Sequence, residues 1–188
     1  MNNFNNKKIS NKKGFTIIET LVAIFILLVS TTGPLTFAQS GLRSSFLARD
    51  QITAFYIAQD SIETLKNIRD NTSLYNRNQS SSTKVPWLFD FGVCSPSVLG
   101  ETVTCNFDDA QAQSCGDSDC TTPLYFDSET KKFSITSNSR TVPSKYIRTI
   151  YVTELIQDRE AQVIVKVEWD SNFFATKRII IQENIYNI

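Results

Sequence analysis

The feature that most constrains this chain is a basic leader followed at once by a long apolar segment near the N-terminus. The leader has no acidic residue and carries four lysines: Lys7, Lys8, Lys12 and Lys13. Between residues 15 and 38 the one charged side chain is Glu19. As a helix this segment reaches about 36 Å, enough to span a hydrocarbon core of about 30 Å. The positive flank predicts that the leader stays cytoplasmic while the following chain crosses the membrane.

Three residues give the start of the apolar segment a recognisable pattern. Gly14 ends the leader, Phe15 opens the apolar segment, and Glu19 is the fifth residue when Phe15 is counted as the first. This pattern resembles the N-terminal signature of type IV pilins and related prepilins, which include the pilin-like proteins of type II secretion and competence systems. The resemblance implies a cut after Gly14 by a prepilin peptidase, and N-methylation of Phe15. It also implies that Glu19 pairs with the terminal amine of a neighbouring subunit during assembly.

Two alternatives accompany this interpretation. A carboxylate inside an apolar span costs about 2.5 to 3.5 kcal/mol on insertion scales and usually has a partner. Glu19 lies within about one turn of the cytoplasmic face, so partial hydration is the alternative to subunit pairing. An ordinary secretory signal would instead be cut beyond the apolar core, here near residues 30–35.

Composition narrows the functional classes. The net charge of the 188-residue chain is zero and no basic patch stands out, so nucleic acid is not an implied partner. Histidine is absent, which removes the commonest general base and every Ser-His-Asp or Cys-His arrangement. We therefore expect neither enzymatic activity nor a cofactor.

The amphipathic pattern predicts where the helix goes after the membrane. Gly33 and Pro34 interrupt the apolar run, and a proline removes one helical hydrogen bond and kinks the axis. Beyond them apolar residues recur at mostly three- and four-residue steps: Leu42, Phe46, Ile52, Phe55, Tyr56, Ile62, Leu65 and Ile68. We expect this helix to cover the core of a head and to end near residues 70–73.

The last third of the chain predicts antiparallel strands. Apolar runs at 124–126 and 133–135 flank a polar turn and indicate a hairpin. Three longer runs, at 146–156, 161–169 and 174–186, have short connections and predict a meander. In the middle run four alternate residues point to one buried face: Val163, Val165, Val167 and Trp169. A weaker strand is expected at 102–107.

Together these patterns predict an α+β, pilin-like fold in which the helix packs against a C-terminal antiparallel sheet. The expected divisions are a cytoplasmic leader (1–14), the transmembrane half of the helix (15–38), its amphipathic half (39–73) and a β-rich head with a cysteine-containing loop (74–188).

The cysteines lie close together in the head: Cys94, Cys105, Cys115 and Cys120. Four cysteines allow three pairings, and in a translocated region we expect disulfides in an oxidising compartment. Pairing by nearness joins Cys94 to Cys105 and Cys115 to Cys120. A zinc site is disfavoured because there is neither a Cys-x-x-Cys pair nor a histidine.

Acidic residues gather in the same region: Asp108, Asp109, Asp117 and Asp119. Carboxylate oxygens are calcium ligands, but the spacing matches no calcium loop, so a solvated loop is the preferred interpretation and no metal is expected. Better-known pilins often place a disulfide near the C-terminus; this chain departs from that pattern, so their adhesive role is not carried over.

The C-terminal pattern is similar to the tail of minor pilins, with a strand ending in Val-Glu-Trp-Asp and a last strand containing Ile-Ile-Ile. The first hypothesis is a structural subunit, a minor pilin of a type IV pilus or a type II secretion or competence pseudopilin. Its implied partners are the prepilin peptidase and methylase, other pilin subunits and the inner membrane, before assembly into a surface filament. The alternative from another class is a membrane-tethered extracytoplasmic binding module.

Overall fold

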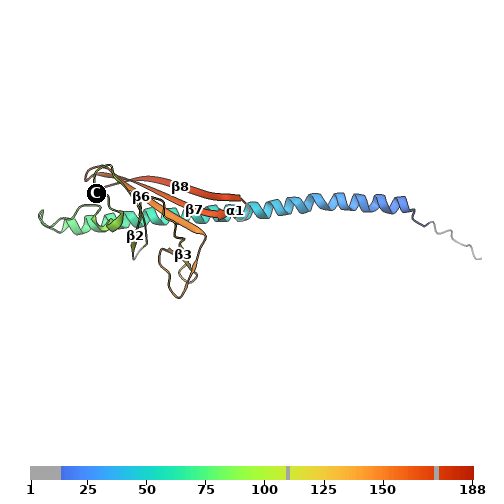
Figure 1. The fold of residues 1–188 in the computed structure, drawn as a ribbon, viewed down its shortest axis with the longest axis horizontal. Coiled ribbons are helices and arrows are strands. Elements are labelled where there is room, and N and C mark those ends of the chain that lie inside the picture. The colour runs from blue at the N-terminus through green and yellow to red at the C-terminus, as the bar shows by residue number, and fades with distance from the viewer. Residues whose placement is uncertain (1–13, 109–110, 172–173) are drawn as a thin grey trace, which may run out of the picture. The chain divides into compact units, whose positions relative to one another are not determined.

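The computed structural model describes residues 14–108, 111–171 and 174–188 (Figure 1). The predictions for the leader before Gly14 and for Asp109 lie outside the described residues, as do residues 172 and 173 before the last strand. The chain divides into two compact units between Phe46 and Leu47. The long helix α1 (Ile17–Arg77) contributes to both.

In the first unit, α1 is apolar and every described residue up to Phe46 is exposed. It is the one described helix long and apolar enough to cross a membrane. The helix continues through Pro34. Hydroxyl groups within the span donate to backbone carbonyls of the preceding turn, as Thr31 does to Leu27 at 3.0 Å and Thr36 to Gly33 at 2.8 Å. These hydroxyl groups are therefore satisfied inside the helix itself, as an apolar surrounding requires.

In the second unit, α1 buries a face that differs in part from the predicted one. Ile62 and Leu65 are buried as expected and Ile68 is half-buried, whereas Ile52, Phe55 and Tyr56 are exposed. Two further predicted positions, Leu42 and Phe46, fall in the first unit and are exposed as well. The buried face instead includes the small residues Ala54, Ala58 and Ser61. Small side chains let the sheet approach the helix backbone closely, which hydrophobic periodicity alone does not indicate.

The helix also ends later than predicted, at Arg77 rather than at 70–73. Its last turn is held by side chains. Thr72 donates to Asp90 Oδ2 at 2.6 Å, and the Asn76 amide donates to the carbonyl of Val85 at 2.8 Å and accepts from the Val85 N–H at 3.0 Å. These contacts join the helix end to the segment that follows it and satisfy polar groups that would otherwise end the helix sooner.

The main sheet of the head is antiparallel, with five described strands in the order β2-β1-β6-β7-β8. The strands are β1 (Thr102–Phe107), β2 (Ala112–Gly116), β6 (Tyr146–Ile156), β7 (Glu160–Ser171) and β8 (Phe174–Tyr186). The predicted meander is β6-β7-β8, and the weaker predicted strand is β1. Strand β2 was not predicted, because its residues are mostly exposed and polar.

A smaller sheet has the order β4-β3-β5, formed by β3 (Tyr125–Asp127), β4 (Phe133–Ser134) and β5 (Thr141–Pro143). Strands β3 and β4 are the predicted hairpin, and β5 was not predicted. A short 3-10 helix, η1 (Phe89–Cys94), precedes β1.

The core of the head lies between α1 and one face of the main sheet. The predicted inward residues of β7 are all buried: Val163, Val165, Val167 and Trp169. Trp87 and Phe91, from the segment between α1 and β1, complete the core. The Trp87 indole N–H donates to Glu154 Oε1 at 2.8 Å. The predicted α+β, pilin-like arrangement is confirmed.

Candidate functional site

The first candidate site is the start of α1. Gly14, Phe15 and Thr16 precede the helix, and apart from its chain neighbours no described residue has an atom within 4 Å of where a Cβ on Gly14 would be. Phe15 is 79% exposed. The backbone of Gly14 and Phe15 is therefore outside regular structure and is not covered by any other described residue.

Glu19 lies in the first turn of the helix. The Thr16 hydroxyl accepts a hydrogen bond from the Glu19 N–H at 3.3 Å, so Thr16 caps the helix and Glu19 occupies the third helical position. A carboxylate there also interacts favourably with the positive end of the helix dipole. Within the described residues no ion pair involves Glu19, which leaves its side chain exposed for a cation from outside the chain.

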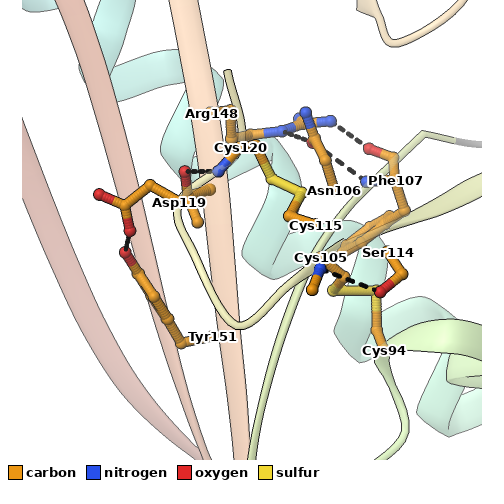
Figure 2. The surroundings of a disulfide bond; sticks show 12 residues. Cys94, Cys105, Asn106, Phe107, Ser114, Cys115, Asp119, Cys120, Arg148 and Tyr151 are labelled. Carbon is orange, nitrogen blue, oxygen red and sulfur yellow. Dashed lines mark hydrogen bonds between the residues drawn. A yellow bond between two sulfur atoms is a disulfide. The ribbon is translucent and has the colours of Figure 1, made fainter. Parts of the chain in front are cut away.

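The cysteine region forms a second feature, which Figure 2 shows at close range. The structure joins Cys94 to Cys105 and Cys115 to Cys120, with Cα–Cα distances of 5.5 and 5.1 Å. This is the pairing by nearness. Cys94 and Cys105 are both fully buried and tie η1 to β1. Cys115, near the end of β2, and Cys120 close a short ring, which we call the cysteine ring (residues 115–120).

The cysteine ring folds over the face of the main sheet that points away from α1. The Cys120 N–H donates to the Thr149 hydroxyl at 3.1 Å, and Asp119 accepts hydrogen bonds from Tyr151 and Lys166 (Figure 2 shows the Tyr151 bond). The hydrogen bonds from Lys166 and Tyr151 hold the pKa of the Asp119 carboxyl below its usual range.

Lys166 corrects one detail of the sequence interpretation. Its place in the alternation of β7 predicts a solvent-facing side chain, yet the residue is buried under the cysteine ring. Burial lowers its pKa, but hydrogen bonds to Asp119 and to Glu168, whose Oε2 lies 2.8 Å from Nζ, outweigh burial and raise the pKa above the usual value. The ion pair with Asp119 explains how a lysine can be buried here.

Asp108, like Asp119, acts as a hydrogen-bond acceptor. Asp108 accepts from the N–H of Gln111 at 2.9 Å and from the N–H of Ile135 at 3.0 Å, which ties the β1–β2 turn to the smaller sheet. Across the described ranges, no three Asp, Glu, Cys or His side chains are grouped as metal ligands.

Arg148 is a buried residue that sequence reasoning missed. It lies on β6 facing α1 and donates to Asn106 Oδ1 at 2.7 Å, to Ser61 Oγ at 2.9 Å and to the carbonyl of Phe107 (Figure 2 shows the Phe107 bond). Burial lowers the pKa of Arg148 to about 10, although the charges of Asp60 and Asp108 act in the opposite direction. The sequence signal for its burial was its position on β6, two residues from both Tyr146 and Ile150, so that all three side chains lie on the same face of the strand.

Comparison with known proteins bears on the first site. Residues 9–33 match the family model described as the prokaryotic N-terminal methylation motif, and the match contains Gly14, Phe15 and Glu19. No curated protein and no solved structure matches the chain. The N-terminal segment is that of a type IV prepilin-like protein. With its long apolar helix and α+β head, the chain is a pilin-like or pseudopilin-like subunit.

Proposed function

We propose that this chain is a minor pilin, a structural subunit of a type IV pilus or a related filament. The observation that carries the proposal is the methylation motif at residues 9–33, which continues into a single apolar helix exposed on all sides. The proposed layout is a cytoplasmic leader to residue 14, a membrane-spanning half of α1 to residue 38, an amphipathic half, and the β-rich head.

Processing begins at the leader. A prepilin peptidase cuts the bond between Gly14 and Phe15, and the new amine of Phe15 is methylated. Access to this bond is supported by the non-helical backbone before Ile17 and by the open space around Gly14 with respect to the part of the chain that the structure describes. Before assembly the subunit is anchored in the cytoplasmic membrane by α1, and the head lies on the outer side.

Assembly then uses Glu19. Cleavage creates a cation at Phe15, and a carboxylate held in an apolar span is stabilised by a cation from a neighbouring subunit. Apolar residues of α1 in the head also remain exposed, among them Ile52 (56%) and Tyr56 (65%), and offer a surface for packing against neighbours. The minor-pilin assignment rests on the C-terminal pattern of Val-Glu-Trp-Asp in β7 and Ile-Ile-Ile in β8.

Glu19→Gln tests the assembly role. Glutamine keeps the shape and removes the charge, so we expect normal membrane levels, normal cleavage after Gly14 and less protein in surface fibres. The measurement is the ratio of sheared to membrane-bound protein, together with the intact mass of the mature chain. Glu63→Gln, which changes an exposed carboxylate of the same helix within the head, is the matched control.

The outcomes separate the competing functions. An unchanged ratio, in cells whose parent chain enters fibres, favours a tethered binding module that has no neighbour to pair with. A mature chain that begins near residues 30–35 would indicate a secreted protein. Recovery with a secretion machine instead of surface fibres would assign the chain to the pseudopilins.

A further inference from the structure

Strand β8 forms a long open edge of the main sheet. It has 13 residues, and among the described residues it pairs with β7 alone. The pairing runs without a register shift from Lys177 to Tyr186. Such an edge presents a row of unpaired backbone N–H and C=O groups, which another strand can join.

The opposite edge of the sheet is protected in ways that β8 is not. Strand β2 has five residues, its pairing with β1 shifts register between Thr104 and Cys105, and it continues directly into the cysteine ring. Short strands, bulges and covering loops are common means of preventing edge-to-edge pairing. The two edges of this sheet therefore differ in their capacity to accept another strand.

The sequence of β8 is complementary to itself when read antiparallel. Lys177 and Arg178 precede three isoleucines, and Gln182 and Glu183 follow them. The register with β7 places Lys177, Ile179, Ile181 and Glu183 on the side of the sheet that faces α1, because their partners are Trp169, Val167, Val165 and Val163. Arg178, Ile180 and Gln182 lie on the other side.

We propose that β8 pairs antiparallel with β8 of a second copy of this chain, about a two-fold axis at Ile180. Each Lys177 then lies opposite Glu183 of the other copy, and each Arg178 lies opposite Gln182. Ile179 lies opposite Ile181, and Ile180 lies opposite itself, so every directly opposed pair is favourable. Glu183 already accepts from Lys66 of its own chain at 2.5 Å and gains a second cation in the pair.

The charges select this register. The α1 helices of the two copies lie on the same face of the joined sheet only if the two-fold axis passes through a residue. A slip of the pairing by one position would turn every side chain of one copy to the other face. Moving the axis to Ile179 places Lys177 opposite Ile181, and moving it to Ile181 places Glu183 opposite Ile179. Only the axis at Ile180 pairs both charges.

The direction of α1 within the head determines which copies can pair. The Tyr146 hydroxyl donates to the carbonyl of Asp50 at 3.4 Å, at the end of the sheet where Lys177 lies, and Arg69 donates to the carbonyl of Tyr186 at 3.0 Å at the other end. This part of α1 thus runs parallel to β8. In the two-fold pair the two chains enter their heads from opposite ends.

The β8 pair thus joins two heads whose α1 segments run in opposite directions. It is distinct from the helix packing proposed for assembly within one filament, which uses the N-terminal unit. The inferred role is head-to-head association of two copies through their sheet edges.

The test uses the full chain in detergent micelles, which leave the copies free to orient. Sedimentation should show a monomer–dimer equilibrium at concentrations up to about 100 μM, since a contact limited to one strand edge is small. Lys177→Glu and Glu183→Lys should each raise the dimer dissociation constant by about tenfold or more, because the two-fold axis creates two like-charge pairs. Combining both substitutions should restore the parent value.

A direct readout excludes association through the apolar helix. Ile180→Cys places a thiol on the axis, and a short bismaleimide should link two copies through it. Val142→Cys is the matched control, since Val142 is exposed to a similar extent (56% against 53%) on β5 and should give no linked dimer. A monomeric parent, a double charge variant that stays weakened, or a dimer that is not linked through residue 180 would overturn the proposal.

Discussion

The two units of the chain carry information in different ways. From Gly14 to Phe46 every described residue is exposed, whereas the head has a core, two disulfides and an ion pair whose lysine is buried. Yet the family match falls in the N-terminal unit, at residues 9–33. A linear motif read by an enzyme has to be present residue by residue, while a core can be filled by many combinations of apolar residues. The unit with the fewest internal contacts is therefore the one that carries the recognisable motif.

The same contrast exists along α1 itself. In the first unit its surface carries large apolar residues on all sides, which fits lipid and neighbouring helices. In the head its buried face uses Ala54, Ala58 and Ser61, which fit a sheet at close range. One continuous helix thus meets two environments, and substitutions in the two halves should affect different properties.

The largest expected effect separates processing from folding. Gly14→Leu should abolish cleavage of the leader, because the peptidase is expected to act on an open glycine at the membrane face, while the melting temperature of the head stays unchanged. Intact mass of the membrane protein measures the first and thermal unfolding the second. Gly41→Leu, at another exposed glycine of the first unit, should be cleaved normally. Cleavage of the Gly14→Leu chain would contradict this prediction, because it would show that processing does not need the glycine.

The contrast also explains what could be predicted from the sequence. Helix α1, the β3–β4 hairpin and the β6-β7-β8 meander follow from periodicity. The roles of Gly14, Phe15 and Glu19 come from a motif and stay predictions. The burial of Lys166 could not be predicted, and that of Arg148 was indicated only by its place in the alternation of β6, because both depend on partners that only the folded chain brings together. Asp119 is distant from Lys166 in sequence, as Asn106 and Ser61 are from Arg148. Exposed, short strands such as β2 leave no periodic signal.

The second prediction ranks the two disulfides within the head. Loop-closure entropy predicts a loss of about 3 kcal/mol in unfolding free energy for Cys94→Ala/Cys105→Ala and about 2 kcal/mol for Cys115→Ala/Cys120→Ala, whose sequence separations are 11 and 5. Removing both should cost about 5 kcal/mol. Urea unfolding of a fragment from Leu47 onward measures these differences. The reverse ranking would mean that the cysteine ring does more than close a loop.

The third prediction concerns the buried arginine. Arg148→Met should lower the free energy of unfolding by about 3 kcal/mol, since charge-assisted hydrogen bonds to Asn106, Ser61 and Phe107 are lost and their acceptors stay buried. Arg140→Met is the matched control: Arg140 pairs with Glu129 at 3.1 Å, its side chain is 58% exposed, and the expected loss is about 0 to 1 kcal/mol. Equal losses at both sites would show that burial of Arg148 is not what makes it important.

The smallest expected effect is at Asp119, where the cysteine ring meets the sheet. The hydrogen bonds from Lys166 and Tyr151 lower the pKa of Asp119 in the folded state below the usual 3.8. A lowered pKa means that the unfolded chain takes up the proton first on acidification. The stabilisation is therefore complete above the unfolded-state pKa and is lost as the pH falls through the folded-state pKa. Because the Asp119 side chain is 47% exposed, it amounts to about 1 kcal/mol or less.

Asp119→Asn should accordingly be less stable than the parent at pH 7, by about 1 kcal/mol or less. The difference should shrink as the pH falls below 3.8, since the parent then loses the charge that the variant never had. Asp117→Asn, in the same cysteine ring and exposed, should behave like the parent throughout. Urea unfolding between pH 7 and pH 2 provides the measurement. A difference that stays constant over this range would show that Asp119 acts through packing of the ring rather than through its ion pair with Lys166.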